Sequence, residues 1–349
     1  MRASLFAVAR ALAFVVLALV LCSVIFEAAG YSSILMFQSI AEGAFMTRAA
    51  LLNSLSWALP LFVMAAGVVV SFRCGYFNIG AQGQLYFGAM GAAFVVEWLH
   101  GASALVVVPA AIVAGMAAGM AWSGWPGVLR VYSGTDEVIS TLMADFIATL
   151  VLVYVTSGPL KDPSGTGQVA ASRPIAAIYR ISGAGGVSPG IIGVVVISGV
   201  LVWLLINRTA FGVLSSLAGR NPVMVRWQGA GLARLGLASF LVSGAFAGLA
   251  GTLVFLGPQG RLVSGLMPGE GFTAILIALV GGLTVTGVAV VSLFFGGLAA
   301  ASLYLPVIAG LPAAAIDVIN AAIALFITAR AWPRLPRLSL GLRLPRRAL

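Results

Sequence analysis

Apolar runs of about 20 residues recur from one end of this chain to the other, and they restrict the fold more than any other feature. A helix of that length crosses the hydrocarbon core of a bilayer, which is about 30 Å thick. Because no water is present there, each segment must satisfy its own backbone polar groups, as a helix does. The runs lack the two-residue alternation of membrane β-strands. The sequence therefore predicts an all-α, polytopic membrane protein.

We expect ten membrane-spanning helices in a single domain that covers residues 1–332. The expected spans are 9–29, 52–72, 81–99, 104–125, 137–157, 188–206, 233–256, 271–284, 286–304 and 312–331. At about 1.5 Å per residue the span 271–284 is too short to cross, so we expect short or broken helices near the membrane midplane. Residues 333–349 form a basic cytoplasmic tail, for which contact with anionic membrane lipid and simple solvation both stay open.

The charge of the chain supports this interpretation and orients the helices. The formal net charge is +10, yet charged residues make up only 8% of the sequence, against about a quarter in a typical soluble domain. With both termini in the cytoplasm, most of the 19 Lys and Arg residues fall on the inner side, as the positive-inside rule requires. Topology thus explains the charge, and we expect no nucleic-acid partner. Glu137, also on the inner side, is a candidate to pair with Arg220 or Arg226.

Two interruptions of the apolar pattern form the candidate transport site. The first is RCGYFNIGAQGQ (73–84), and the second is the Gly-containing short span 271–284. Polar breaks are tolerated at membrane depth only where they face protein or a water-filled cavity, and paired broken helices mark transport sites. The side chains that we expect along the substrate pathway are Tyr76, Phe77, Asn78, Gln82, Gln84, Asp145 and Phe272.

These side chains indicate an uncharged solute. Amides hydrogen-bond hydroxyl groups or base edges without carrying a charge, and Tyr76 and Phe77 offer faces for a ring. A neutral polar lining suits a hydroxylated solute better than an ion. The alternative is a structural kink whose amides are satisfied within the protein, and the glycines alone would also permit close helix packing.

The sequence lacks the patterns of an enzyme and of an ion-driven carrier. Its only lysine, Lys161, lies in PLKDP, so it has no Gly-x4-Gly-Lys-Ser/Thr phosphate-binding loop. Its only histidine, His100, falls at an outer helix end, where neither a zinc site nor a catalytic triad is expected. The acids at membrane depth are Glu97, Asp145 and Asp317, too few for a proton relay or a sodium site. We expect no cofactor or metal in this chain and a source of energy outside it.

Two longer polar stretches connect the expected spans. Residues 158–187 are rich in Gly, Pro and Ser and are expected to form an outer cap. Residues 207–232 fall on the cytoplasmic side, where Pro222 is placed to open a short helix that runs to Trp227. A short amphipathic helix of this kind lies along the membrane surface.

Five sequence blocks in a fixed order carry a resemblance to a known family. They are FNIGAQGQ (77–84), EVISTLMADFIA (137–148), GRNPVMVRWQGA (219–230), SGAFAGLAGTLVFLG (243–257) and GEGFTAILIALVGGL (269–283). Together they resemble the permease subunits of bacterial ABC importers for nucleosides and simple sugars, which work with a basic membrane lipoprotein-type binding protein. The resemblance extends over about residues 50–330.

The resemblance implies a transport complex in the bacterial inner membrane. Two permease subunits would form its core, with a cytoplasmic ATPase that binds ATP and Mg²⁺ and an extracytoplasmic solute-binding protein. The EVIST block is closer to one of the two permease types, which favours a heterodimer with an unlike permease. The resemblance also places the ATPase-coupling motif in 207–232. Its candidate residues are Gly219, Asn221, Pro222, Arg226 and Gly229, to which we add Arg220 and Trp227.

Two positions depart from the family's pattern. The family usually has Glu where this chain has Gln82, and Asn where it has Asp145. Both fall on the expected pathway, so the solute can differ from that of the commonest members. An ABC importer permease for a neutral hydroxylated solute is our main hypothesis. An ion- or proton-driven secondary transporter acting alone is the alternative, and a passive channel or structural subunit is a third.

Overall fold

The computed structural model describes residues 16–164, 169–181, 183 and 186–330. In these ranges the chain is helical, and the only β-structure is two isolated bridges near the outer loop. The prediction of an all-α protein is therefore confirmed for the described part of the chain. The basic tail expected at 333–349 lies outside the described residues.

The described chain forms two compact units, residues 16–30 with 317–330 and residues 31–316. The first unit holds the helix Val16–Ala28 and most of α14 (Ala315–Arg330). In its first helix the buried apolar side chains are Ala18, Cys22 and Phe26. Their spacing of four residues places them on one face of the helix. The candidate site lies entirely in the second unit.

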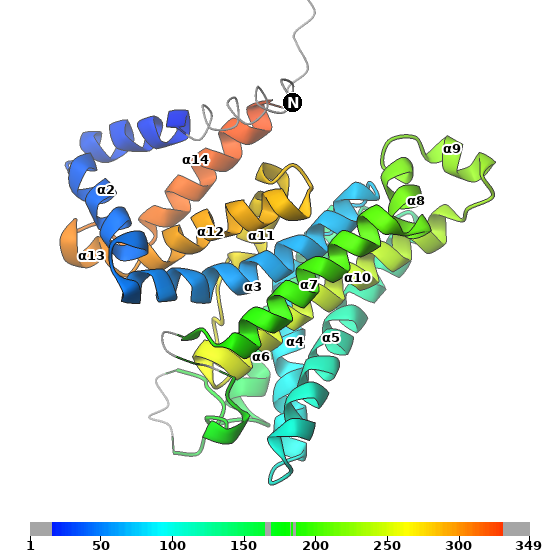
Figure 1. Cartoon of the computed structure of the whole chain (residues 1–349), viewed down its shortest axis with the longest axis horizontal. Coiled ribbons are helices and arrows are strands. Elements are labelled where there is room, and N and C mark those ends of the chain that lie inside the picture. The colour runs from blue at the N-terminus through cyan, green and yellow to red at the C-terminus, as the bar shows by residue number, and fades with distance from the viewer. Residues whose placement is uncertain (1–15, 165–168, 182, 184–185, 331–349) are drawn as a thin grey trace, which may run out of the picture. The chain divides into compact units, whose positions relative to one another are not determined.

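The second unit contains twelve further α-helices, shown in Figure 1. They are α2 (Ser33–Ala41), α3 (Arg48–Arg73), α4 (Ala81–Trp98), α5 (Ala104–Val128), α6 (Glu137–Ser157), α7 (Pro189–Arg208), α8 (Ala210–Ala218), α9 (Pro222–Trp227), α10 (Leu232–Val254), α11 (Glu270–Val280), α12 (Val285–Ala301) and α13 (Leu305–Ile308). Single π-helical turns extend three elements: η1 (Glu42–Met46) follows α2, η2 (Leu129–Ser133) follows α5 and η5 (Phe255–Gln259) follows α10.

Five helices are long and apolar enough to cross a membrane. They are α3, α5 with η2, α6, α7, and α10 with η5. All ten expected spans overlap helices of the structure, but the helices at the two ends and at α11 and α12 are shorter than a full span. The predicted short helix at 271–284 is present as α11, with 11 residues. The chain is thus a multi-pass membrane protein, and the number of ten spans stays a prediction.

Helices α3 and α10 form the centre of the second unit. In the most apolar stretch of each helix, 72% of the α3 residues and 89% of the α10 residues are buried, against 22% in α5. Small residues bring α10 against α4 and α5: a Cβ added to Gly88 or to Gly119 would collide with the backbone at Gly248. Close approach of backbones through small residues is typical of helices packed in membranes. The outer faces of α5, α6 and α7 are left for lipid or for partner subunits.

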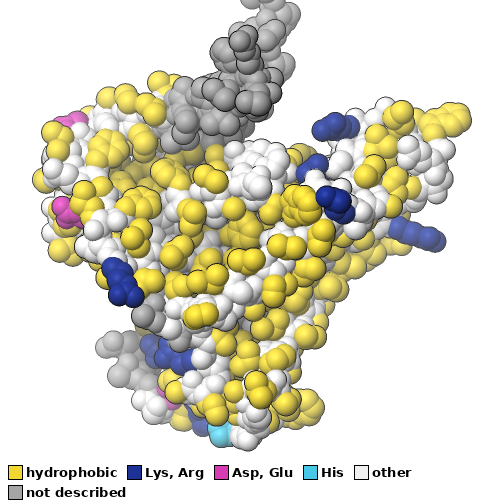
Figure 2. Space-filling view, viewed as in Figure 1, with side chains coloured by type: hydrophobic (Ala, Val, Ile, Leu, Met, Phe, Trp, Pro, Cys, Tyr) yellow, Lys and Arg dark blue, Asp and Glu magenta, His cyan; other side chains and the backbone are white. Residues whose placement is uncertain are grey.

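Basic side chains gather at two ends of the second unit, with an apolar belt between them (Figure 2). At one end, beside α8 and α9, lie Arg73, Arg208 and Arg234, at the termini of α3, α7 and α10. The single His100 lies at the opposite end of the second unit. This distribution agrees with a membrane protein that has residues 207–232 on one side and 158–187 on the other.

The outer loop folds back over the turn η5. Backbone N–H groups of Ser172, Ile175 and Ile181 donate to carbonyl oxygens of residues 262, 260 and 256, at 2.9, 2.8 and 2.9 Å. The buried hydroxyl of Tyr179 accepts from the Gly101 N–H (3.0 Å) and donates to the Ala102 carbonyl (2.9 Å). These bonds tie the loop to the α4–α5 turn, so its described part forms an ordered cap.

Candidate transport site and coupling segment

The polar interruption predicted from the sequence lies between α3 and α4. Helix α3 ends at Arg73 and α4 begins at Ala81. Gly75 adopts a φ of 83°, a left-handed conformation that favours glycine. Asn78 is fully buried within this connection. Residues 74–80 are therefore not helical. Because Asn78 is buried inside the second unit, its polar groups need hydrogen-bond partners in the protein.

Asn78 and Gln84 form a reciprocal pair of amides. The Asn78 Nδ2 group donates to Gln84 Oε1 (3.2 Å), and Gln84 Nε2 donates to Asn78 Oδ1 (2.9 Å). Asn78 Nδ2 also donates to Ser243 Oγ on α10 (3.1 Å), and Asn78 Oδ1 accepts from the Gly80 N–H (3.1 Å). Buried amides are thus satisfied, and they fix the interruption to the central helix.

Gln82 joins the first interruption to the second. Its Nε2 group donates to the Met267 carbonyl (2.9 Å), and its Oε1 accepts from the Gly271 N–H (2.6 Å). A Cβ on Gly271 would lie only 2.5 Å from the Gln82 backbone nitrogen. The two breaks therefore touch although 189 residues separate Gln82 from Gly271.

Asp145 on α6 contacts the first turn of α4. Its Oδ1 accepts from the Gly83 N–H (2.7 Å), and its side chain is only 5% exposed. The Asp145 Oδ2 and the Trp122 Nε1 are buried, and neither has a hydrogen-bond partner among the described residues. Both side chains border Gly83, where a Cβ would lie 2.8 Å from Asp145 Oδ1 and 2.9 Å from Trp122 Nε1. Trp122 is a polar contributor that our sequence analysis missed, because its indole is hidden in an apolar run.

The three aromatic candidates do not lie together. Phe77 and Phe272 are 49% and 46% exposed. Tyr76 is half-buried and packs against Phe240 of α10, with ring centroids 6.0 Å apart. The structure therefore places Tyr76 against the cluster that holds Ala218 of α8 and Val225 of α9, whereas Phe77 and Phe272 stand on the surface of the chain next to the two breaks.

The segment between α7 and α10 consists of α8 and α9. The short helix predicted from Pro222 to Trp227 is present, and the Asn221 Oδ1 accepts from the Met224 N–H (3.2 Å) as its N-cap. Gly229 follows with a φ of 72°, as is common after a helix end. Arg226 and Trp227 are exposed, the latter by 85%. This segment presents its polar and aromatic residues outward.

A small apolar cluster joins α8 and α9 to the polar interruption. Its buried members are Cys74, Ala218, Val225 and Leu235, and Tyr76 packs against it. Burial raises the pKa of the Cys74 thiol. Because Cys74 and Tyr76 belong to the interruption itself, helices α8 and α9 and the candidate transport site share one core.

The prediction that Glu137 pairs with Arg220 or Arg226 was wrong. The Glu137 carboxylate pairs with the Arg130 guanidinium at 2.9 Å, not with Arg220 or Arg226. The turn η2 returns Arg130 to the start of α6, which makes this local pair possible. Residues 219–229 therefore make no ion pair with α6 among the described residues.

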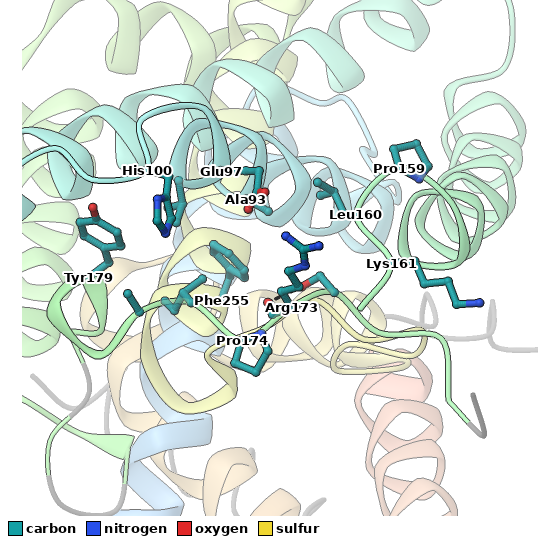
Figure 3. Close-up of a pocket in the computed structure, with 14 residues that line it drawn as sticks. Ala93, Glu97, His100, Pro159, Leu160, Lys161, Arg173, Pro174, Tyr179 and Phe255 are labelled. Carbon is teal, nitrogen blue, oxygen red and sulfur yellow. Dashed lines mark hydrogen bonds between the residues drawn. The ribbon is translucent and has the colours of Figure 1, made fainter. Parts of the chain in front are cut away.

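A polar cavity of about 450 Å³ lies at the outer end, among α4, the cap and Phe255. Figure 3 shows Arg173 extending toward Glu97, Lys161 pointing away, and His100 beside Tyr179. The sequence places His100 at a helix end but does not predict this cavity, because the walls of the cavity come from distant segments. Among the described residues no group of His, Cys, Asp or Glu is arranged to hold a metal ion.

Comparison with known proteins gives a consistent family. A family model described as "Branched-chain amino acid transport system / permease component" matches residues 50–328. The guanosine ABC transporter permease protein NupP of Bacillus subtilis is 31% identical over 317 residues, covering 90% of each chain. The glucose ABC transporter permease protein TsgB13 of Haloferax volcanii is 31% identical over 282 residues, covering 77% of this chain and 73% of its own.

A third relative, the nucleoside ABC transporter permease protein NupB of Lactococcus lactis, is 25% identical over 328 residues, 90% of this chain and 89% of its own. The same B. subtilis and L. lactis strains each contribute a second permease match, NupQ and NupC, so these relatives come in pairs. No solved structure matches. Since the family match covers most of the chain, the protein belongs to the family of branched-chain amino acid transport system permease components.

Proposed function

We propose that this chain is one membrane subunit of an ABC importer that moves a neutral hydroxylated solute, a nucleoside or a simple sugar, into the bacterial cytoplasm across the inner membrane. The contact between the two polar breaks, through Gln82 and Gly271, carries this proposal. Broken helices that meet inside a membrane protein are the usual setting of a transport site. The printed names of the relatives, which include guanosine, nucleoside and glucose permeases, support this class of solute.

The proposed complex has three kinds of partner. Relatives that occur as pairs support a second, unlike permease. ATP and Mg²⁺ bind to a separate cytoplasmic ATPase, because the sequence has no phosphate-binding loop. A solute-binding protein delivers the solute to the outer face. In this arrangement the ten spans have both termini in the cytoplasm, with residues 158–187 outside and 207–232 inside.

We assign the substrate pathway to the surface beside the two breaks. Phe77 and Phe272 are half-exposed there, and their rings offer stacking faces to a base or a sugar. Asn78, Gln82, Gln84 and Asp145 line the breaks behind them and hold their backbone in place, while Tyr76 marks the inner end. Since the amides are bonded within the protein, their main contribution in this state is to the shape of the passage.

We assign ATPase coupling to residues 219–229. Helix α9 is short, outward-facing and anchored by the exposed Trp227, which suits a groove on a partner subunit. Gly219, Asn221, Pro222 and Gly229 set its geometry, and Arg220 and Arg226 add charge for recognition. Movement of α9 reaches the breaks through the cluster of Cys74, Ala218, Val225 and Leu235.

Uptake into proteoliposomes tests this function against its alternatives. The chain is reconstituted with its second permease, ATPase and binding protein, and uptake of labelled guanosine and glucose is measured with internal ATP, with ADP, or with an imposed sodium or proton gradient. We expect uptake with ATP alone, only in the complete complex. Uptake by the isolated chain under an ion gradient would establish the secondary carrier instead, and passive equilibration would establish a channel.

A further inference from the structure

A cavity of about 340 Å³ opens at the inner end of α3, on the side of α8. Its walls come from three places in the chain: the end of α3, the end of α8, and the turn between α11 and α12. The lining residues are Phe72, Arg73, Ser216, Gly219, Arg220, Gly282, Leu283 and Thr284. The transport pathway assigned above does not use this cavity.

Positive charge in this cavity has no counterpart. Arg73 and Arg220 both line it, and none of its lining residues is acidic. The salt bridge found among the described residues joins Arg130 to Glu137 and involves neither of these two arginines. Two like charges that share a cavity repel each other, so the folded state favours an anion between them.

The cavity holds one guanidinium in a fixed position. Arg73 donates through Nε to Ser216 Oγ (3.2 Å) and through Nη1 to the Leu283 carbonyl (3.4 Å). A guanidinium has five N–H donors, so further donors remain for a ligand. Arginine presents them in a planar fork that matches the oxygens of a phosphate group. Thr284, which lines the cavity, is the N-cap of α12. The N-terminal end of this helix adds to the positive potential.

The position of the cavity favours a phosphate that belongs to a lipid. The long apolar helix α3 ends at Arg73, which places the cavity at the level of the inner headgroups. Phe72 and Leu283 give it apolar walls. Val213 of α8 and Leu279 of α11, each three residues before a lining residue in the sequence, are 64% and 39% exposed. The acyl chains of a lipid can pack against these apolar side chains, whereas a free phosphate ion gains nothing from them. The cytoplasmic leaflet is also the one that carries anionic lipid.

We propose that this cavity binds the phosphate group of an anionic phospholipid in the inner leaflet, with Arg73 and Arg220 as its ligands. The bound lipid bridges α8 to α3 and to the α11–α12 turn. It thereby stabilises the end of α8, from which the chain continues into α9. This proposal goes beyond the transport function, and it is tested on the isolated chain without solute, ATPase or binding protein.

Native mass spectrometry of the purified chain, with phosphatidylglycerol or phosphatidylcholine added to the detergent, measures the binding. We expect phosphatidylglycerol to bind about tenfold more tightly than phosphatidylcholine, as a charge-assisted contact implies. Arg220→Gln should abolish this preference, and Arg220→Lys should retain part of it. The Arg220 backbone N–H donates to the Leu217 carbonyl (3.1 Å), but no hydrogen bond or ion pair of its side chain is found among the described residues, so its replacement should leave folding intact. Arg234→Gln, at an exposed arginine outside the cavity, is the matched control.

Three results would overturn the proposal. The first is an unchanged lipid preference in Arg220→Gln. The second is displacement of phosphatidylglycerol by millimolar inorganic phosphate, which would make the site one for free phosphate. The third is equal binding of phosphatidylglycerol and phosphatidylcholine by the wild-type chain, which would show that the two arginines do not select an anionic lipid.

Discussion

Gly219 lies directly against Gly75, so that its Cα is 3.0 Å from the position that a Cβ on Gly75 would occupy. In the other direction, a Cβ on Gly219 would collide with the Arg73 carbonyl oxygen. The turn between α8 and α9, which belongs to the proposed coupling segment, therefore touches the polar interruption backbone to backbone, with no side chain between them. A displacement of one backbone must then move the other, because no flexible side chain lies between them to rearrange and packed interiors are stiff.

Replacement of Gly219 by valine should uncouple ATP hydrolysis from uptake. The new side chain forces α8 and α9 away from Arg73 and Gly75, at a cost of about 1–3 kcal/mol for overpacking. We expect the complex to assemble and to hydrolyse ATP, while solute uptake per ATP hydrolysed falls about tenfold or more, the ratio expected for such an energy. Parallel assays of phosphate release and labelled-solute uptake in proteoliposomes measure this ratio.

Gly193→Ala supplies the control for this substitution. Gly193 lies in α7, and a Cβ there would meet no atom within 4 Å, so the variant should couple normally. Normal coupling in Gly219→Val would show that the contact with Gly75 does not transmit motion. Loss of coupling in both variants would point to a general effect of altering glycines.

The Cys74 thiol should report movement of the coupling segment. It is 2% exposed, and burial raises its pKa, so at pH 8 it carries less reactive thiolate than an exposed cysteine. We expect very slow labelling by a maleimide in the resting complex. Turnover of ATP should speed labelling, because opening of the cluster exposes the thiol and returns its pKa toward the ordinary value.

A Cys22→Ala background makes this measurement specific, because Cys22 and Cys74 are the two cysteines of the chain. Labelling of the denatured protein gives the full extent of reaction, and a complex whose ATPase cannot hydrolyse ATP gives the resting rate. Equal rates in the resting and the turning-over complex would contradict movement of α8 and α9 against the interruption.

Gln82→Leu should destabilise the contact between the two breaks. It leaves the buried Gly271 N–H without its partner, which costs about 1–3 kcal/mol. It also removes the 2.9 Å hydrogen bond to the Met267 carbonyl, which keeps only the longer one from the Glu270 N–H (3.4 Å). Met267 adds to this cost because it is a non-glycine residue with a φ of 45°, a strained conformation that its surroundings must hold. Thermal unfolding of the purified chain in detergent measures the loss, and uptake should fall with it.

The exposed Gln38 of α2 provides the same substitution without these bonds. Gln38→Leu should leave both the unfolding temperature and uptake unchanged. A Gln82→Leu chain that unfolds at the wild-type temperature would mean that the amide does not hold the two breaks together.

The helices and their interruption were predictable from local sequence, because apolar length and a polar break are properties of consecutive residues. The same holds for the helix from Pro222 to Trp227, since Asn-Pro marks its start. The partners of the polar groups were not predictable. Gln82 meets Gly271 across 189 residues, and neither lies in a repeat that would reveal the pairing. Knowing only the side of the membrane on which Glu137 lies could not distinguish Arg130 from more distant arginines.

Burial also hid what the polar side chains do. The sequence left open whether Asn78 and Gln84 bind a solute or are satisfied within the protein. In the structure they bond to each other, and Asn78 also bonds to Ser243. That outcome depends on which face of α10 approaches the interruption, a property of helix packing that periodicity does not give. Trp122 escaped notice for the opposite reason, because a tryptophan in an apolar helix looks like lipid-facing surface.

Removal of the exposed rings beside the breaks should weaken transport without weakening the fold. Phe77→Ala and Phe272→Ala remove side chains that are 49% and 46% exposed, so each deletes only half-buried apolar surface, which for Phe77 includes its edge-on contact with Phe72. Stacking of a base on an aromatic ring is worth about 1–3 kcal/mol, and we expect the solute concentration for half-maximal uptake to rise about tenfold. Initial rates of ATP-driven uptake over a range of guanosine or glucose concentrations measure this change.

Phe94→Ala is the matched control, since Phe94 is also 46% exposed but lies four residues before the end of α4 at Trp98, away from both breaks. Its removal takes the same apolar area from a surface that faces lipid. A pathway at the breaks requires that uptake respond to Phe77 and Phe272 and not to Phe94. Equal responses at all three positions would show that the chain merely tolerates loss of surface aromatics poorly, and the solute passage would then have to be sought on another face of the second unit.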